Sequence, residues 1–514
     1  MVHEIFQFEG YTLDVTRGSL RAGDREVELR PKSFEVLRYL VENASRLVPK
    51  EELFGAIWPG IFVGDDSLAR CVSEVRSALR DEHQRIIKTV PRRGYLFAAT
   101  VSQPKPAALP LPDRPSIAVL PFSNLSGDPE QDYFSDGVSE DVITGLSKFR
   151  DLFVIAHHSA SNYKGQQFDA KQIGSELGVR YLLVGSVRRG TARLRITVQL
   201  VDANTAHQLW AEHYDREPTD IFAVQDEVTQ KIVVTLVTHV AKSELVRALR
   251  KPPHTLAAYD YYLRGNALMK TMQRDKRGQT IATIRALYQE ALNADPNYAL
   301  AMHALANTYF SGWIEPTAHE PIAREYRDQS VLDHALSVVQ RAVELDETLP
   351  EAHATLAWIL HWQYRREESL AEYALAFELN PNLADGRFGH VLSQNGRNAE
   401  AIDFLKRVMR LDPFHPPLYL MYLGSAYYLD GRYQEAFEVL RAAARRLPGF
   451  RPVHVWRAAA SARLDRSEEA MEAAAEVLRL QPDFTISEFL LLTRHAKQEH
   501  AERLAEGLRK AGLP

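Results

Sequence analysis

The chain has 514 residues, of which 45% are hydrophobic and 25% charged, and its formal net charge at pH 7 is −5. A chain of this length exceeds what one hydrophobic core can hold, so we expect two to four domains. The single cysteine, Cys71, excludes an intramolecular disulfide framework and a cysteine-rich zinc site, and it suits a reducing compartment. No window approaches the roughly 20 apolar residues that cross a bilayer, so we expect a cytoplasmic protein without membrane contact.

Two proline-containing stretches divide the sequence. Residues 101–115 contain five prolines, which remove amide donors and favour an extended, semi-rigid spacer. The stretch Lys251-Pro252-Pro253 marks a weaker second break. We therefore predict an N-terminal domain over 1–102, a linker over 103–115, a middle domain over 116–245 and a C-terminal domain over 254–514.

The N-terminal domain begins with four short strand-like runs between turn-forming residues, which predicts a small antiparallel sheet. The runs cover residues 5–8, 11–15, 19–21 and 27–29. Pro31 and Pro49 each suit the first turn of a helix. A third helix is predicted over 67–80, after the cap-forming Asp65 and Asp66. Its apolar face holds Leu68, Val72, Val75 and Leu79.

Positive charge is concentrated in the third helix and in the hairpin that follows it. Residues 67–98 hold seven Lys and Arg against three Asp and Glu, whereas residues 1–66 hold eight against twelve. The hairpin tip, Pro91-Arg92-Arg93-Gly94, offers two guanidinium groups. Neutralisation of phosphates supplies most of the sequence-independent affinity for DNA, so this polarity predicts a DNA-binding face.

Three motifs in this order resemble the OmpR/PhoB winged-helix family. They are LRPKSFEVL at 29–37, VPKEEL at 48–53 with Trp58 after it, and KTVPRRGY at 88–95. In that family the third helix enters the major groove and a wing arginine reaches the minor groove. The resemblance therefore implies DNA contacts from Arg70, Ser73, Arg76, Ser77, Arg80, Thr89, Arg92 and Arg93. Among these, Thr89 is expected to help hold the DNA backbone.

One departure from the family is Ser73-Glu74, where members often carry adjacent basic residues. We therefore expect an acidic-polar reading face and modest affinity. The alternative for Arg70, Arg76 and Arg80 is a solvated helix face, but the match across the whole domain favours DNA binding. Cys71, at the border of the apolar stripe, is interpreted as a packed residue rather than a redox sensor.

The order of the segments resembles ToxR/CadC-like one-component regulators, which place the winged helix first and a sensing module after it. No phosphoacceptor domain precedes the winged helix, so we expect no phosphorelay control from this chain. The membrane helix of many such regulators is also missing.

The middle segment alternates strand-like and helix-like runs, which predicts an α/β domain with a mixed sheet of four or five strands. The strand-like runs lie at 117–122, 153–156, 181–187, 194–200 and 209–214. Two stretches, VLPFSNLSGDPEQDYFSDGVSEDVITGLS and YLLVGSVRR, resemble the TolB N-terminal-like module that occurs beside tetratricopeptide (TPR) arrays. The resemblance implies a binding role and carries over no catalytic residue.

Candidate catalytic and metal-ligating patterns are weak. The acidic residues around Asp136 lack the spacing and glycine of a calcium loop, and Asp136 before Gly137 is interpreted as a helix N-cap. His157 and His158 match no zinc-hydrolase spacing, and neither GxxxxGK nor GxSxG occurs. We therefore expect no enzymatic activity, no metal site and no cofactor.

The C-terminal segment contains a repeat. A polar residue or leucine precedes proline at Pro296, Pro381, Pro413, Pro448 and Pro482, and from Pro381 the intervals are 32, 35 and 34 residues. This matches the 34-residue TPR period and predicts five or six repeats. The first helix of each pair lines the concave side of such a superhelix. Candidate partner contacts there are His303, Asn307, Phe310, Trp358, His361, His390, Met421 and Tyr428. The alternative for each is a core or plain surface residue.

The sequence thus favours a multidomain α+β and all-α protein that acts as a bacterial one-component transcription regulator. Residues 67–80 and 91–94 would bind double-stranded DNA in a sequence-specific manner, and the α/β and TPR regions would receive a partner or ligand signal. The alternative is a TPR scaffold or cyclase-associated signalling protein whose winged helix docks protein rather than DNA. The operator, the direction of regulation, the signal and the oligomeric state stay open.

Overall fold

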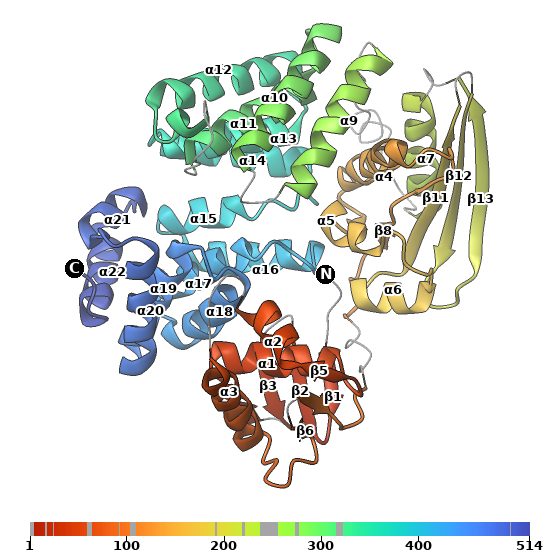
Figure 1. Cartoon of the computed structure of the whole chain (residues 1–514). Helices are drawn as coiled ribbons and strands as arrows, with labels where there is room; N and C mark the ends of the chain where they lie inside the picture. The colour runs from red at the N-terminus through yellow and green to blue at the C-terminus, as the bar shows by residue number, and fades with distance from the viewer. Residues whose placement is uncertain are drawn as a thin grey trace. The chain divides into compact units, whose positions relative to one another are not determined.

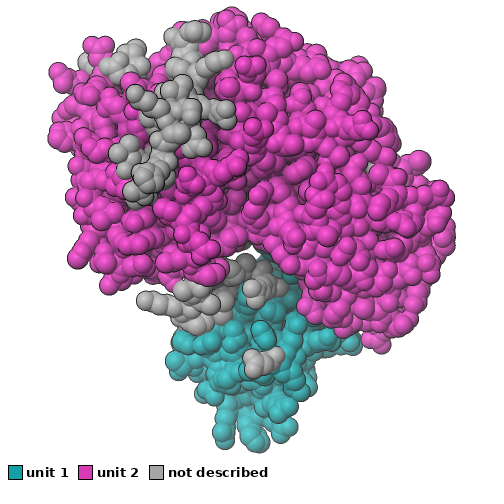
Figure 2. All heavy atoms as spheres, turned by 180° about the vertical axis from the view of Figure 1, so that it is seen from behind, with its two compact units in different colours: residues 1–107, 441–450 teal, residues 108–440, 451–514 magenta. Residues whose placement is uncertain are grey.

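The computed structural model describes most of the chain, and the account below is confined to the described residues. These are residues 5–15, 18–23, 25–58, 64–91, 93–102, 109–190, 193–217, 221–236, 255–272, 277–314, 322–493 and 495–514. The chain divides into two compact units, coloured separately in Figure 2. One comprises residues 1–107 with 441–450, and the other comprises residues 108–440 with 451–514.

The N-terminal domain consists of three helices between two small sheets. The first sheet has the antiparallel order β1 (Ile5–Phe8), β2 (Tyr11–Asp14), β3 (Ser19–Ala22), β4 (Arg25–Val27). The helices are α1 (Pro31–Glu42), α2 (Lys50–Ile57) and α3 (Asp65–Ala78). The second sheet has the order β5 (Leu47–Pro49), β7 (Gly94–Phe97), β6 (Ile87–Val90). These elements confirm the winged-helix fold expected from the sequence.

Apolar side chains from all three helices meet in one core. Leu37, Leu53 and Val75 are each fully buried, and Phe97 of β7 joins them. The N-cap of α3 is Gly64, and Asp65 and Asp66 lie in its first turn rather than at the cap position. Carboxylates there still favour the helix, because they lie beside the positive end of its dipole.

The middle domain is a mixed sheet with helices packed against it. Its strands are β8 (Ser116–Val119), β9 (Ser123–Asn124), β10 (Phe153–Val154), β11 (Tyr181–Arg189), β12 (Leu194–Asp202) and β13 (Gln208–Arg216). The order is β10-β8-β11-β12-β13, parallel from β10 to β11 and antiparallel from β11 to β13. The mixed sheet is confirmed, but it has six strands, because the two-residue β9 also pairs with β11. Its helices are α4 (Asp132–Ser147), α5 (His157–Ala160), α6 (Ala170–Leu177) and α7 (Ile221–Leu236).

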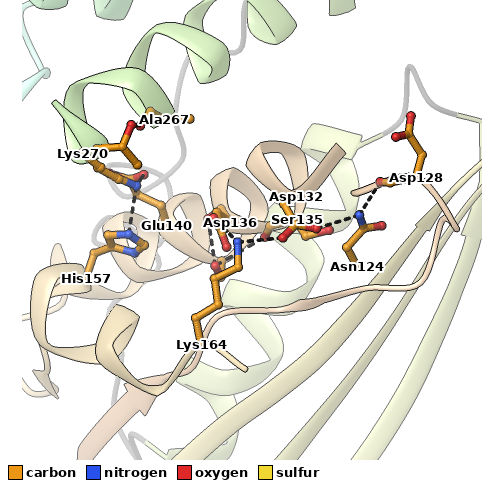
Figure 3. Close-up of polar contacts among 12 residues, drawn as sticks. Asn124, Asp128, Asp132, Ser135, Asp136, Glu140, His157, Lys164, Ala267 and Lys270 are labelled. Carbon is orange, nitrogen blue, oxygen red and sulfur yellow. Dashed lines mark hydrogen bonds and ion pairs between the residues drawn. The ribbon is translucent and has the colours of Figure 1, made fainter. Parts of the chain in front are cut away.

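Helix α4 begins one turn earlier than the sequence pattern indicated. Its first residue is Asp132, so Asp136 lies inside the helix and the N-cap interpretation of Asp136 is wrong. A short 3-10 turn capped by Asp128 leads directly into α4 and extends it at the N-terminal end. Figure 3 shows the Asp136 carboxylate facing Lys164, whose Nζ donates to Asp136 Oδ2 at 2.8 Å.

The C-terminal segment is a series of antiparallel helix pairs (Figure 1). The helices are α9 (Leu256–Thr271), α10 (Arg277–Ala294), α11 (Ala299–Ile314), α12 (Gln329–Leu345), α13 (Pro350–Trp362), α14 (Arg366–Leu379), α15 (Arg387–Gln394), α16 (Asn398–Leu411), α17 (Leu418–Leu429), α18 (Tyr433–Arg446), α19 (Arg451–Arg463), α20 (Ser467–Leu480), α21 (Ile486–Thr493) and α22 (Gln498–Lys510). A short 3-10 helix, Ile322–Glu325, follows α11. The helix pairs confirm the TPR-like architecture.

Helix α9 belongs to the cores of both the sheet domain and the repeats. Tyr259 and Leu263 pack among the apolar side chains of the sheet domain, whereas Ala258 packs among those of the repeats. The buried carboxylate of Asp141 in α4 accepts hydrogen bonds from Tyr259 and from Gln225 of α7. Burial and the neighbouring Asp141 raise the pKa of Tyr259 well above its usual value, so its hydroxyl stays protonated and donates.

A repeat turn also holds the C-terminal end of α4. Asn382 Nδ2 lies 2.8 Å from the carbonyl oxygen of Ser147, 3.3 Å from that of Phe149 and 3.0 Å from that of Leu152. The last carbonyls of a helix have no partner within the helix, so they need donors from elsewhere. Asn382 supplies one while being only 4% exposed.

The substitution Asn382→Ala should therefore loosen the end of α4. Loss of the amide removes the donor to the carbonyls of Ser147 and Leu152, which costs about 1–3 kcal/mol. We expect amide hydrogen exchange over residues 144–152 to become roughly fivefold to a hundredfold faster, measured on the full-length protein by mass spectrometry. Asn297→Ala is the matched control, because Asn297 occupies the corresponding turn of another repeat and its side chain is exposed. Equal exchange in the two variants would contradict the docking role.

Candidate nucleic-acid interface

Helix α3 presents one face to the core and the other to solvent. Leu68, Val72 and Val75 are buried, as the apolar periodicity predicted. The opposite face and the turn after it carry exposed side chains that the sequence assigned to DNA contact. These are Arg70, Ser73, Ser77 and Arg80.

The Arg76 side chain reaches across to the hairpin. Its Nη2 lies 2.8 Å from the carbonyl oxygen of Ile87 and 2.7 Å from Thr89 Oγ1, and its Nε lies 3.2 Å from the same Ile87 oxygen. The Nη2 atom also donates to Gln84 Oε1 at 3.1 Å. Two residues expected to touch DNA, Arg76 and Thr89, thus hold each other. This contact fixes α3 relative to β6.

The carboxylate of Glu74 contacts the start of α1. Its Oε1 accepts a hydrogen bond from the Arg30 backbone N–H at 3.1 Å, and Oε2 lies 3.9 Å from Arg30 Nε. Arg30 is the N-cap residue of α1, where backbone donors lack helical partners. Glu74 therefore belongs to the contact between α1 and α3 rather than to an acidic reading face.

A second carboxylate, Asp81, is used inside the domain. It is 5% exposed, and it accepts from the N–H groups of Arg85, Ile86 and Ile87 at 2.6, 3.1 and 2.8 Å. These bonds shape the turn between α3 and β6. Two of the three acidic residues in 67–98 are therefore engaged within the protein, and Glu82 is the exposed one. Among the described basic residues of this region, Arg70, Arg80, Arg85, Lys88 and Arg93 have exposed side chains.

The wing depends on Gly94. This residue has φ +141°, and a Cβ there would lie 2.0 Å from the carbonyl oxygen of Val48 on β5. Only glycine permits β7 to approach β5 this closely. At the tip, the Arg93 N–H donates to the carbonyl of Val90 at 3.0 Å, and the Arg93 side chain is exposed. Arg92 lies outside the described residues.

Five of the candidate repeat residues are packed inside the repeats. Phe310, Trp358, His361, Met421 and Tyr428 are 6%, 6%, 2%, 5% and 0% exposed. His303, Asn307 and His390 are half-buried. Contact between these side chains and a partner stays a prediction, and the half-buried residues are the more accessible set.

Rings from neighbouring repeats cluster around Trp358. The His361 ring stacks on it with centroids 5.6 Å apart, and His390 lies 5.8 Å from both. Burial lowers the pKa of His303 to about 3 and that of His390 to about 4, so both rings are neutral at pH 7.

The sequence missed Gln84, Glu74 and Asp81 as residues that shape the interface. Gln84 and Arg80 have positive φ angles of 53° and 52°, which no local signal indicated. A carboxylate directly after a basic helix, such as Asp81, often accepts from backbone N–H groups, and this was the only sequence pattern that indicated such a role. Among the described residues, no group of three or more His, Cys, Asp or Glu side chains is arranged to hold a metal ion.

Three family models match parts of the chain. The model for the C-terminal domain of transcriptional regulatory proteins matches residues 24–97. The model for the second domain of HilA/YgeH-like transcriptional regulators matches residues 113–231, and a tetratricopeptide repeat model matches residues 386–415.

Three curated relatives cover different shares of the chain. Putative adenylate cyclase 3 of Rhizobium meliloti (strain 1021) is 41% identical over 270 residues, which is 51% of this chain and 43% of that protein. Transcriptional regulator HilA of Salmonella typhi is 24% identical over 436 residues, 83% of this chain and 74% of HilA. PhoB, the phosphate regulon regulatory protein of Escherichia coli (strain K12), is 28% identical over 99 residues, 19% of this chain and 43% of PhoB. The chain spans less than half the length of the first and last of these.

These matches confirm the OmpR/PhoB-type domain and the TPR repeats, and they assign a HilA-like module to the middle segment. The chain therefore has the domain composition of a DNA-binding transcription regulator. No helix in the described ranges has both the length and the apolar character needed to span a bilayer.

Arg76 and Arg70 form a matched pair for testing the clamp between α3 and the hairpin. Hydrogen bonds from a charged donor contribute about 1.5–3 kcal/mol, so Arg76→Ala should speed amide exchange over residues 84–97 by tenfold or more in the full-length protein. Arg70 is exposed on the same helix, and Arg70→Ala should leave that exchange within about threefold of wild type. Similar exchange in both variants would show that Arg76 does not hold the hairpin.

Proposed function

We propose that the protein is a one-component transcription regulator that binds double-stranded DNA through α3 and the β6–β7 hairpin. The α/β domain and the repeats receive the signal. We keep the domain division expected from the sequence, with the DNA-binding domain over 1–102, a linker over 103–115, the α/β domain over 116–245 and the repeats over 254–514.

The observation that carries this proposal is that basic side chains on α3 and the hairpin are exposed, whereas acidic side chains nearby contact the protein itself. Arg70, Arg80 and Arg93 are exposed, whereas Asp81 is buried and Glu74 contacts α1. A positive face of this kind releases condensed counterions when it neutralises phosphates. With Asp81 buried and Glu74 turned to α1, the exposed face carries fewer acidic side chains than the sequence count alone indicates.

We assign recognition of the DNA base sequence to the solvent-exposed face of α3. Ser73 and Ser77 offer hydroxyls that donate and accept, and Arg70 offers a planar fork that suits the guanine edge. The wing arginine, Arg93, is assigned to the minor groove. Arg76 is assigned a positioning role, because its guanidinium is already shared among Ile87, Thr89 and Gln84.

A cyclase-associated scaffold is the second candidate, and the similarity to a putative adenylate cyclase favours it. Ser73-Glu74, the departure from the family pattern, supports this candidate only weakly, because Glu74 contacts α1. We propose a non-catalytic role, since the matched family models describe two regulator domains and a repeat. We also place the protein in the cytoplasm, where a DNA target and a free cysteine are both accommodated.

Arg93→Ala tests the DNA assignment. Removing one positive charge from the minor groove, where it lies between the two phosphate backbones, should weaken binding to every sequence and reduce the slope of log K against log salt concentration by about 1. Fluorescence anisotropy with a labelled mixed-sequence duplex, titrated at several salt concentrations, measures both quantities on the full-length protein. The control is Arg25→Ala, since Arg25 is an exposed arginine on β4. No binding by wild type even at low salt, or the same slope in both variants, would contradict the proposal.

A further inference from the structure

The last helix pair does not continue the stacking of the repeats. Helix α22 packs along α19 and α17, the first helices of the two preceding pairs, and Figure 1 shows it beside α19. The Tyr428 hydroxyl of α17 donates to the carbonyl of Arg503 at 2.9 Å. Arg503 Nη1 in turn donates to the carbonyl of Leu429 at 2.9 Å. These contacts seat α22 on the ends of other repeats.

The approach between α22 and the repeats is close at Gly507. A Cβ at Gly507 would lie 2.4 Å from the Tyr428 hydroxyl and 3.3 Å from Ala459 Cβ on α19. A glycine is needed here because no side chain fits between the helices. Leu504 and Leu508 flank it and are fully buried.

The segment before α22 continues across two more repeats. Arg366 Nη2, at the start of α14, lies 3.3 Å from the carbonyl oxygen of His495. The N–H of Ala496 donates to the carbonyl of Gln394 at 2.8 Å. Residues 495–510 thus contact the start of α14 and the C-terminal ends of α15 and α17, and α22 also packs along α19. Of these helices, α15, α17 and α19 are among those expected to line the concave face.

Several polar atoms of this segment and of the helices beside it lack hydrogen-bond partners within the described ranges. Gln394 is 0% exposed, yet its Oε1 and Nε2 have no hydrogen-bond partner among the described residues. Both ring nitrogens of His495 and Nδ1 of His390 lack one as well within the described ranges. Buried polar atoms without partners cost free energy, so a ligand that pairs them would bind these helices better.

We propose that residues 495–510 are a resident self-ligand of the repeats, and that the partner is an amphipathic helix of the same chemistry that displaces them. Such a helix carries a glycine or alanine where Gly507 lies, leucines at the positions of Leu504 and Leu508, and a side chain with donor and acceptor atoms for Gln394. Docking of an apolar helix face into a groove is a recurrent mode of recognition. This inference rests on the proposed reception of a partner by the repeats and names that partner's chemistry.

The tether sets the strength of competition. A segment held in the same chain acts at an effective concentration on the order of millimolar, so a free peptide at micromolar concentration loses to it. Weakening the resident segment should therefore reveal binding of the same sequence added as a separate peptide.

The test uses the full-length protein and a fluorescent peptide of residues 491–514. Gly507→Val places a side chain against Tyr428 and should release α22, so the labelled wild-type peptide should bind this variant at least tenfold more tightly than it binds wild type. Glu502→Ala is the control, because Glu502 is exposed on the same helix. A peptide that itself carries Gly507→Val should not bind. Peptide binding that is the same in all three proteins overturns the proposal.

A second measurement covers the case in which Gly507→Val disrupts the repeats. A protease site placed after the exposed Asp483 allows the full-length protein to be cut between α20 and α21. We expect the released 31-residue end to exchange with added labelled peptide on a size-exclusion column while helicity is retained. A fragment that leaves only when the repeats unfold overturns the proposal and makes α22 an integral part of the domain. Both readouts are peptide binding by the repeats, so a failure of DNA binding would leave them unaffected.

Discussion

The guanidinium of Arg76 joins α3 to the hairpin, the two parts of the proposed DNA-binding face. A reading helix and a wing must meet two grooves of one duplex at a fixed separation, so their relative geometry has to exist before DNA arrives. Arg76 supplies it through bonds to Ile87, Thr89 and Gln84. Bonds from one rigid, planar group to a backbone carbonyl and two side chains restrict both distance and angle. In the proposed complex, Arg70, Arg80 and Arg93 would contact one duplex together because this clamp holds α3 and the hairpin in a fixed arrangement.

Side-chain hydrogen bonds also fix the geometry where the α/β domain meets the repeats. In two other repeat turns, Asp295 and Asp346 accept from the N–H two residues later, at 3.1 Å in each case. Asn380 Oδ1 likewise accepts from the Asn382 N–H, but Asn380 Nδ2 also donates to Ser147 Oγ at 2.9 Å. The next turn uses Asp412, which accepts from Ser159 and lies 3.2 Å from His158 Nδ1. The turn position occupied by Asp295, Asp346, Asn380 and Asp412 is thus used, in two neighbouring repeats, to contact the α/β domain.

Local sequence patterns were enough to predict most of the helices and strands. The contacts that they did not predict are made largely by long side chains. Apolar periodicity located α3 and placed Arg76 on its outer face, yet an arginine is long enough to bend back to β6, and no spacing rule shows that. Glu74 was assigned to the reading face for the same reason. The start of α4 was misplaced because a capped 3-10 turn feeds into it. Five of the eight repeat candidates proved buried, since neighbouring repeats cover them in a way that the sequence of one repeat does not show.

The position of α22 is the feature least accessible from sequence, and it bears most on how a signal is received. A partner changes the state of the protein only by as much as its affinity differs between the state with the resident helix and the state without it. A competing helix must therefore bind the repeats with an affinity higher than that of the resident helix by at least the factor that the tether contributes. Apolar contacts at the positions of Leu504 and Leu508 are open to any amphipathic helix and provide little of that excess. The Gln394 amide, which has no hydrogen-bond partner among the described residues, can provide that excess, because a partner with a matching polar side chain recovers the free energy of the missing bonds. Selectivity of the repeats then lies in the groups that the resident helix fails to satisfy, while the apolar contacts that it does make exclude weak and unspecific competitors.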